Sequence, residues 1–302
     1  MDRTVTTVID AGKCIGCGMC VNVCPYETIS MEAGKAVVSG NRSLSCGHCA
    51  AVCPVDAVRV DALDKESSCY SSFMGNDTWL PYGEYNTGEL VRLMRSRRSC
   101  RNYHDRAVDR ALLEDLVKIG ITAPSGTNSQ LWTFTILPTR KAVLNLGERF
   151  AFFFRKLNRI SEKKYLRYFL KLIGKPELDV YFRERHDSVA QALNEWEKSC
   201  RDRLFHGATA AILIGSKPGA SCPKEDALLA TQNVLLAAHS MGLGTCLIGY
   251  AVEAMKRDVT IRRFLGIPDD ERVYSVIALG YPDEKYTRTA GRKKYTLRCY
   301  DT

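Results

Sequence analysis

The sequence predicts an α+β protein with a small cysteine-rich N-terminal domain and a larger C-terminal domain. Seven of the 13 cysteines lie between Cys14 and Cys53, and the short stretches around them are typical of β-hairpins with turn residues. The next stretch is rich in Ser, Gly, Asn and Tyr and shows no clean period, which indicates a connector. Beyond it, helical patterns accompany apolar strand-like runs. We therefore expect domains at 1–64 and 89–302, joined by a linker at 65–88.

The composition suits a globular protein that resides in the cytoplasm. The chain has 302 residues, of which 45% are hydrophobic and 25% charged, so it can bury a full core. It contains no run of about 18 apolar residues, so we expect no transmembrane segment. The first residues lack the apolar stretch of a signal peptide. In a reducing compartment, clustered cysteines indicate metal binding rather than disulfides.

Charge is divided unevenly between the two predicted domains. Residues 1–64 hold five basic and seven acidic residues, whereas the remainder holds 38 basic and 27 acidic residues. A basic surface favours anionic partners such as acidic electron carriers, phosphorylated cofactors, nucleic acid or lipid headgroups. Charge alone does not choose among them, and because no other feature indicates nucleic acid, we expect none as a partner.

Two cysteine motifs repeat at an offset of 29 residues. CIGCGMCVNVCP at 14–25 aligns with SLSCGHCAAVCP at 43–54, except that Ser43 stands where the first motif has Cys14. Three thiolates at C-x2-C-x2-C can bind one face of a small cluster, and the fourth cysteine, followed by proline, ligates the other cluster. A zinc site needs only four ligands, so the repeat indicates iron–sulfur clusters.

The repeat resembles the bacterial dicluster ferredoxins over about residues 1–64. The resemblance implies two 4Fe–4S clusters in a small α+β fold that the clusters help to hold together. Cluster I would receive a complete set of ligands: Cys14, Cys17, Cys20 and Cys53. Cluster II would receive three: Cys24, Cys46 and Cys49.

The fourth ligand of cluster II departs from the ferredoxin pattern. Ser43 could ligate through its oxygen, or a distant cysteine such as Cys69 could reach the site. The site could instead hold a 3Fe–4S cluster, or bind its cluster weakly. His48 lies between two ligands and is more typical of a residue that tunes a cluster by hydrogen bonding than of a ligand.

The connector leads into a helix. Asn86 or Thr87 is a suitable N-cap before an apolar stripe that begins at Leu90. Within the connector, Trp79 and its neighbours Leu80 and Tyr82 indicate that this stretch packs against another part of the protein.

Four segments of the C-terminal domain are candidates for binding a cofactor. RRSCRNY at 97–103 gathers guanidinium groups around a serine, which suits a phosphate. APSGTNSQLWTF at 123–134 offers small residues with hydroxyl and amide groups, which allow close approach to a planar ring. GLGTCLIGY at 242–250 has glycines that expose backbone N–H groups, although glycine there also typically ends a helix. ALGYPDEKYTRTAGRKK at 278–294 ends in a basic tail.

Together the four segments resemble the nitroreductase family of FMN-binding flavoproteins, over roughly residues 89–302. The resemblance implies that the first segment grips the FMN phosphate and ribityl chain through Arg97, Arg98, Ser99 and Arg101. The second would reach the flavin of the partner subunit through Pro124, Ser125, Gly126 and Asn128. The third would pass the isoalloxazine ring at Leu243 and Gly244, and the fourth would return Arg292 to the phosphate.

The family fold is α+β, with a mixed sheet surrounded by helices, and forms a homodimer with FMN at the interface. The fusion resembles ferredoxin-containing nitroreductases. We therefore expect an oxidoreductase in which a ferredoxin-type or other low-potential donor, or NAD(P)H, supplies electrons. They would pass through the iron–sulfur clusters and FMN to a small organic acceptor such as a nitroaromatic or a quinone. The alternative is a non-catalytic electron carrier or redox sensor. No segment supplies an obvious general acid or base, so no catalytic residue is assigned.

One segment lies outside the resemblance. Residues 150–175 hold eight basic residues, one acidic residue and many aromatic ones. Four interpretations stay open: a helix whose apolar face packs on the domain, a docking face for an acidic electron donor, a lid over the flavin, or a helix that lies on a membrane surface.

Overall fold

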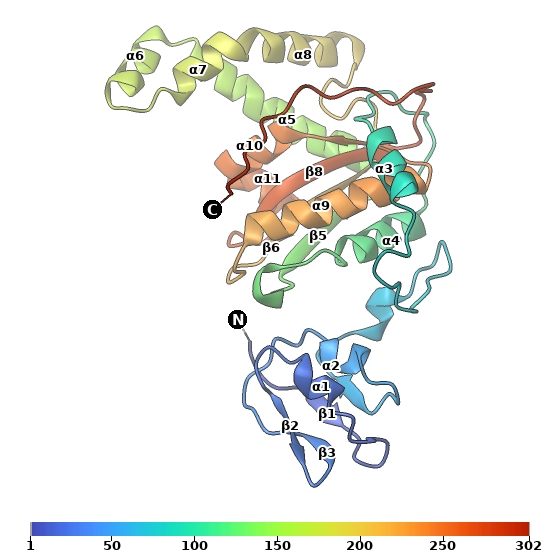
Figure 1. Ribbon diagram of the computed structural model, residues 1–302. Helices are drawn as coiled ribbons and strands as arrows, with labels where there is room; N and C mark the ends of the chain where they lie inside the picture. Colours follow the sequence, from blue (N-terminus) through green and yellow to red (C-terminus); the bar gives the residue numbers. More distant parts are fainter. Residues whose placement is uncertain (1, 302) are drawn as a thin grey trace.

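The computed structural model describes residues 2–301 (Figure 1). The N-terminal part contains two antiparallel strand pairs. The first joins β1 (Thr7–Ile9) to β4 (Val58–Val60), and the second joins β2 (Ile29–Glu32) to β3 (Lys35–Val38). A small core of Ile29, Ala36 and Val58 packs together with the buried side chains of ligand cysteines. A core with so few buried apolar side chains supplies little stability, so the cysteine sites are expected to contribute much of the stability of this domain.

The sequence repeat is also a repeat of structure. Each cysteine motif contains a single-turn helix, α1 (Met19–Asn22) or α2 (His48–Ala51). The residue before each helix is a glycine with positive φ, 72° at Gly18 and 76° at Gly47. Glycine adopts this left-handed conformation without steric cost, so the matching glycines explain the matching turns.

The connector follows the side of the C-terminal domain. It begins with the 3-10 turn η1 (Lys65–Ser68) and leads to α3 (Thr87–Ser96), whose N-cap Asn86 accepts a hydrogen bond from the backbone N–H of Glu89. This confirms the predicted helix start. The fully buried Asp115 accepts hydrogen bonds from the backbone N–H groups of Ser71 and Ser72 and from the Ser72 hydroxyl.

The predicted aromatic contacts of the connector are absent from the described chain. Trp79 is 70% and Tyr82 94% exposed, and their rings pack on each other with centroids 5.9 Å apart. Hydrogen bonds to a buried carboxylate, rather than apolar packing, therefore attach the connector to the C-terminal domain.

A four-stranded sheet forms the centre of the C-terminal domain. Its order is β5 (Trp132–Leu137), β6 (Ala210–Ser216), β8 (Arg272–Gly280) and β7 (Gly244–Leu247). Every pair of these strands is antiparallel. The expected mixed sheet also requires a parallel pairing. Within residues 2–301 this pairing is a single isolated bridge between Ser99 and Thr245.

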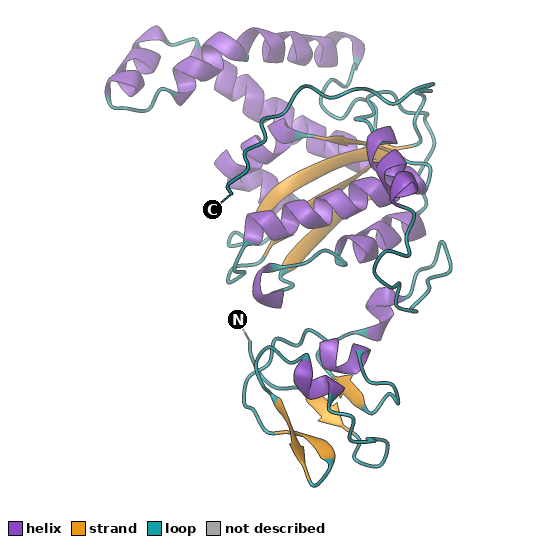
Figure 2. Ribbon diagram, viewed as in Figure 1, coloured by secondary structure: helices purple, strands orange, loops and turns teal. Residues whose placement is uncertain are grey.

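Helices cover both faces of the sheet. On one face lie α4 (Arg110–Gly120) and α9 (Pro223–Ser240), and on the other lie α5 (Arg140–Ser161), α10 (Gly249–Arg257) and α11 (Val259–Phe264). Side chains of a strand alternate between faces, so in β6 Ile212 packs with the first layer and Leu213 with the second. This burial on both sides explains why β6 is apolar throughout. After β8 the chain continues as an extended loop to residue 301 (Figure 2).

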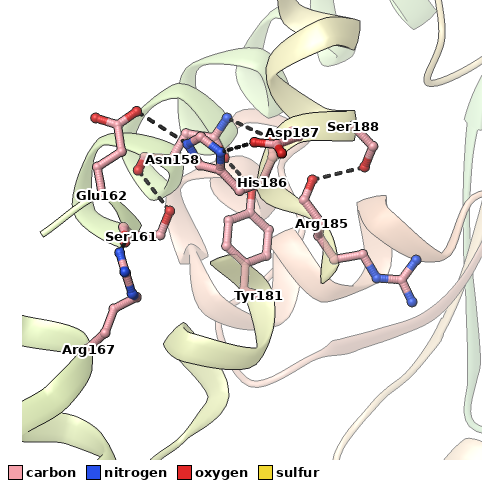
Figure 3. A network of polar contacts seen from close by, with 9 residues as sticks. All are labelled: Asn158, Ser161, Glu162, Arg167, Tyr181, Arg185, His186, Asp187 and Ser188. Carbon is pink, nitrogen blue, oxygen red and sulfur yellow. Dashed lines mark hydrogen bonds and ion pairs between the residues drawn. The ribbon is translucent and has the colours of Figure 1, made fainter. Parts of the chain in front are cut away.

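A helical arm projects from the end of α5 (Figure 1). It comprises α6 (Lys164–Leu172), α7 (Glu177–Glu184) and α8 (His186–Ser199). A polar network ties the arm to α5: the Tyr181 hydroxyl donates to Asn158, and His186 lies between Asp187 and Glu162 (Figure 3).

The segment 150–175 has two different environments. In α5, Phe150 and Phe154 are buried in the core, as the interpretation of a packed helix requires. In α6, Tyr165, Tyr168 and Leu172 are exposed, so this interpretation does not extend to the arm. None of the helices within residues 2–301 has the length and apolar character needed to cross a membrane.

Candidate functional site

Four cysteines surround a first cavity in the N-terminal part. They are the predicted cluster I ligands: Cys14, Cys17, Cys20 and Cys53. The backbone N–H of Ala36 lies 3.5 Å from the Cys14 sulfur, and the N–H of Ala57 lies 3.2 Å from the Cys53 sulfur. The hydrogen bond from Ala36 contributes most to a lowered pKa of Cys14. A thiol that is easily deprotonated suits a metal ligand, because the thiolate is the form that binds.

Three cysteines and a serine surround a second cavity. Cys24, Cys46 and Cys49 line it together with Ser43. Ser43 is 8% exposed, and its hydroxyl oxygen accepts a hydrogen bond from the backbone N–H of Ser45 at 3.0 Å. The structure thus places a hydroxyl at the position where the first motif places a thiol.

Neither alternative ligand has the position of Ser43. Cys69 is exposed, is not among the lining residues of the second cavity, and its thiol lies 3.6 Å from the Lys65 carbonyl oxygen. His48 does line the cavity. The structure therefore gives no support to ligation by Cys69.

The described thiols do not converge on a single metal-ion site. Within residues 2–301, no three His, Cys, Asp or Glu side chains converge closely enough to hold one metal ion. The cysteines instead surround two separate cavities. Thiols arranged around a cavity fit the corners of a polynuclear iron–sulfur cluster better than they fit one zinc ion.

Three arginines meet in the C-terminal domain. Burial, followed by the positive charges of Arg98 and Arg292, lowers the pKa of Arg97. Cys246 makes the smallest contribution and acts in the opposite direction. Like charges gathered in this way provide a site for an anion, and guanidinium groups match the geometry of phosphate. The structure therefore brings residues from the first and fourth predicted segments together.

The third segment joins the same place through β7. The Ser99 backbone bridges to Thr245, and the Cys100 N–H donates to the Thr245 carbonyl at 2.9 Å. A Cβ added to Gly244 would lie 2.8 Å from the Cys100 Cβ and 3.1 Å from the Pro282 Cβ. Glycine is therefore needed here for close packing of three segments.

Leu243 and Arg101 each make contacts that the sequence did not indicate. The Leu243 side chain is buried in the core beneath α9, so only its backbone is available to a ligand. The backbone N–H of Arg101 donates to Glu284 at 3.0 Å. Burial would raise the pKa of Glu284, but hydrogen bonds from Tyr286 and Arg101 outweigh it and lower that pKa. Sequence reasoning missed Glu284, which lies within the fourth segment as PDEKY.

The second segment lies elsewhere. Gly126 donates through its N–H to Asp226 at 2.8 Å, near the first turn of α9. Asp226, which is 3% exposed, was also missed from the sequence because it resembles an ordinary acidic residue in the first turn of a helix. Ser125 accepts a hydrogen bond from the N–H of Gln130, and Pro124 is exposed. The loop is strained, since Thr127 and Asn128 have φ values of 51° and 53°.

Asn128 faces the N-terminal domain. Its side-chain amide donates to the carbonyl of Leu44 at 2.9 Å and to that of Ser45 at 3.3 Å. Arg3 adds a bond to the Thr127 carbonyl at 3.1 Å. The loop predicted at the flavin thus also contacts the chain segment that lines the second cysteine cavity.

The predicted FMN residues of one chain form two groups at opposite ends of α9. Asp226 holds the second segment near the start of this helix, whereas Arg97 lies near its end, where burial and then the Arg97 charge lower the pKa of His239. A helix of 18 residues is about 27 Å long. One chain therefore does not bring all predicted residues to one place.

Two further cavities border α5. The first is lined by Phe150, Trp196 and other residues of α5 and α8, and contains none of the predicted site residues. The second is bounded by Phe154, Tyr181 and the segment 247–250. Its rim includes Leu228 and Leu247, which are 43% and 50% exposed.

Comparison with known proteins agrees with this division of the chain. The model of the nitroreductase family matches residues 94–281, and that of the 4Fe-4S dicluster domain matches residues 13–57. A putative NADH dehydrogenase/NAD(P)H nitroreductase of Archaeoglobus fulgidus is 28% identical over 204 residues, covering 65% of this chain and 88% of the relative. Ferredoxin-2 of Desulfomicrobium norvegicum is 53% identical over 32 residues, covering 11% of this chain and 54% of the ferredoxin.

A solved structure shares the fold. The nitroreductase of Bacteroides fragilis, crystallised with bound FMN, superposes with a TM-score of 0.52 at 22% identity, over 71% of this chain and all of that one. The match of the family model to most of the chain is the stronger finding. The chain therefore belongs to the nitroreductase family and carries a 4Fe–4S dicluster ferredoxin domain at its N-terminal end.

Proposed function

We propose that this chain is an FMN-dependent oxidoreductase that passes electrons from two iron–sulfur clusters to FMN, and from FMN to a small organic acceptor. The observation that carries the proposal is that one chain contains two cysteine-lined cavities and a partly buried arginine, Arg97, on which the positive charges of Arg98 and Arg292 act. The FMN bound in the solved relative from Bacteroides fragilis supports the identity of the anion. Nitroaromatics and quinones are the acceptor classes that we expect.

The arginine group would hold the FMN phosphate. Arg97, Arg98 and Arg292 supply positive charge, and Ser99 supplies a hydroxyl next to them. Bound FMN would supply storage of two electrons, which single clusters lack. The residues of the chain bind the cofactor, orient it and set its electrostatic surroundings, and we assign none of them to proton transfer.

The complete site would be formed by a homodimer. The second segment, with Pro124, Ser125, Gly126 and Asn128, lies at the far end of α9 from the arginines, so the partner subunit would supply it. Exposed apolar side chains of Leu228, Leu229 and Leu247 offer surface for such a contact. In a two-fold dimer the same loops would serve both sites.

The two clusters would differ in their ligands. Cluster I would bind the four cysteines of the first cavity. Cluster II would bind three cysteines, with Ser43 at the fourth corner. We propose that cluster II is either a 3Fe–4S cluster or a 4Fe–4S cluster with an oxygen ligand. An external low-potential donor would reduce the clusters, with NAD(P)H as the alternative source of electrons.

Cofactor binding tests the proposal directly. The protein purified without oxygen should contain one FMN per chain and both iron–sulfur clusters, measured by flavin and iron quantification and by EPR. The double variant Arg97→Ala, Arg98→Ala should bind FMN at least roughly tenfold more weakly, because each hydrogen bond to a charged group contributes about 1.5–3 kcal/mol. Arg92→Ala is the control, since Arg92 is exposed and pairs with Glu89.

The source of electrons is tested by stopped-flow absorbance. Rapid FMN bleaching by a reduced ferredoxin, dependent on intact clusters, supports the proposed direction. Fast reduction by NAD(P)H that is unaffected by cluster loss would contradict it. Wild-type protein that binds no FMN after reconstitution would overturn the flavin assignment and leave an electron carrier. Turnover of a nitroaromatic or quinone separates an enzyme from such a carrier.

A further inference from the structure

The two cysteine cavities stand in different relations to the C-terminal domain. The second cavity is lined by Ser43, Leu44 and Ser45, and the carbonyls of Leu44 and Ser45 accept hydrogen bonds from the Asn128 amide. The Arg3 guanidinium donates to the Thr127 carbonyl at 3.1 Å, which adds a second contact beside it. Cluster II would therefore sit directly behind the segment that touches the flavin domain.

The first cavity makes no such contact. Among residues 2–301, none of its lining residues forms a hydrogen bond to the C-terminal domain. Two of them, Ile15 and Met19, are 62% and 44% exposed, and Cys17 is exposed as well. An exposed apolar rim beside a metal cluster suits the brief docking of an external electron carrier. Electrons would thus enter at cluster I and leave from cluster II.

The loop that receives cluster II is not beside the arginines of its own chain. Asp226 holds Gly126 and Ser129 of this loop near the start of α9. Arg97 directly follows α3, which packs against α9, a helix about 27 Å long. In Figure 1 the N-terminal domain lies below the start of α9, and α3, which leads into Arg97, lies at its other end. FMN is shorter than this helix, so one flavin cannot touch both ends.

We infer that each ferredoxin domain serves the flavin held by the arginines of the other subunit, with cluster II as the exit cluster. The inference rests on the proposed function, since it requires FMN at the arginines and the loop 124–128 against that flavin. Each transfer would oxidise cluster II by one electron and reduce the bound flavin by one electron. Two transfers, with one proton taken from water, would complete the two-electron reduction of the flavin, and two molecules of a reduced ferredoxin-type donor would replace the two electrons through cluster I.

Heterodimers with defined defects test the direction of transfer. Two tags allow purification of dimers in which the chains differ. Cys46→Ala removes a cluster II ligand, and Arg97→Ala with Arg98→Ala removes the phosphate site. In the first heterodimer each chain carries one of these defects. Transfer between subunits then leaves one working pair, the clusters of one chain and the flavin of the other, whereas transfer within a subunit leaves none.

The second heterodimer reverses the expectation. One chain is wild type and the other carries both defects. Transfer between subunits predicts no flavin bleaching after addition of a reduced 2Fe–2S ferredoxin, because the remaining flavin faces the damaged clusters. Transfer within a subunit predicts bleaching of that flavin at the wild-type rate, which would overturn the inference. Bleaching in the Cys46→Ala homodimer would overturn the role of cluster II.

Controls separate this inference from the proposed function. EPR must show that cluster I persists in Cys46→Ala, and flavin content must show one FMN in each heterodimer. If the wild-type homodimer holds FMN but its clusters never reduce it, the proposed function fails. If the wild-type homodimer works and the second heterodimer works equally well, only the crossed path fails.

A variant of the docking contact gives a readout that needs no electron transfer. Asn128→Ala removes both hydrogen bonds to the segment 43–46, so amide hydrogen exchange there should accelerate roughly fivefold to tenfold. Asn233→Ala is the matched control, because that amide donates to the Thr122 hydroxyl and makes no hydrogen bond to the segment 43–46. Unchanged exchange in Asn128→Ala would show that the contact does not hold cluster II against the loop.

Discussion

Replacing Gly244 by alanine tests how the candidate flavin site is assembled. Gly244 begins β7 and lies where the first, third and fourth segments meet. A new Cβ would lie 2.8 Å from both the Cβ and the sulfur of Cys100, and 3.1 Å from the Cβ of Pro282. The Cβ of Cys100 is fixed by its backbone, so a rotamer change cannot relieve the contact. The backbone that carries Arg97 and Arg98 must shift instead.

The cost can be estimated from this geometry. An extra carbon in a closely packed site typically destabilises a protein by about 1–3 kcal/mol. In a domain of this size, 1 kcal/mol lowers the melting temperature by about 2–4 °C, so we expect a decrease of roughly 2–12 °C. Displacement of one arginine that bonds to the phosphate would cost about 1.5–3 kcal/mol, which weakens FMN binding by roughly tenfold or more.

Gly249→Ala is the matched control. A Cβ at Gly249, the first residue of α10, meets no atom within 4 Å. Because alanine favours the helix, this variant should be as stable as wild type or up to about 1 kcal/mol more stable. Calorimetry and titration of the apoprotein with FMN measure both effects. If Gly244→Ala matched Gly249→Ala in melting temperature and FMN affinity, the packing argument for this site would be refuted.

Three further predictions concern the second cluster, the connector and the helical arm. Ser43→Cys should raise the iron content from about seven to about eight per chain if cluster II is 3Fe–4S, with loss of its EPR signal, whereas unchanged iron would contradict a missing corner. Burial would raise the pKa of Asp115, but hydrogen bonds from residues 71–72 outweigh burial and lower that pKa. The connector should therefore become protease-sensitive as the pH falls through the lowered pKa. Asp115→Asn should make the connector protease-sensitive already at neutral pH. The hydrogen bond to Asp187 raises the pKa of His186, so the arm should lose stability as the pH rises through that raised pKa. Hydrogen exchange should show this as a loss of protection in the arm with rising pH, and this pH-dependent loss should be absent in His186→Gln.

The cysteine spacing predicted the N-terminal domain in detail because its ligands are local. The offset of 29 residues aligned the two motifs, and the structure surrounds one cavity with four cysteines and the other with three. Ser43 was singled out by the same alignment, and it does lie in the second cavity. Metal-binding loops of this kind can be interpreted from sequence because each ligand's place follows from a few intervening residues.

The C-terminal site was predicted only in part because its residues meet through the fold. RRSCRNY indicated Arg97 and Arg98, and the basic tail indicated Arg292, which the structure brings together. Neither Glu284 nor Asp226 was predicted, since their partners are distant in sequence: Arg101 is 183 residues from Glu284, and Gly126 is 100 residues from Asp226. A hydrogen bond between residues so far apart leaves no local sequence pattern from which it could be predicted.

The order of motifs along a chain does not show whether two motifs serve a site in the same subunit or sites in different subunits. The second segment follows the first by only about 26 residues in sequence, which suggests one site, yet α9 separates them by about 27 Å. Asn128 explains what the second segment does on its own side of that helix: its amide binds the loop of cluster II. If Asn128 both holds the loop of cluster II and borders a flavin, this one residue would position the electron donor, cluster II, relative to the electron acceptor, the flavin. If the flavin at that contact belongs to the other subunit, as we propose, dimer formation would be a requirement for electron transfer and not only for flavin binding.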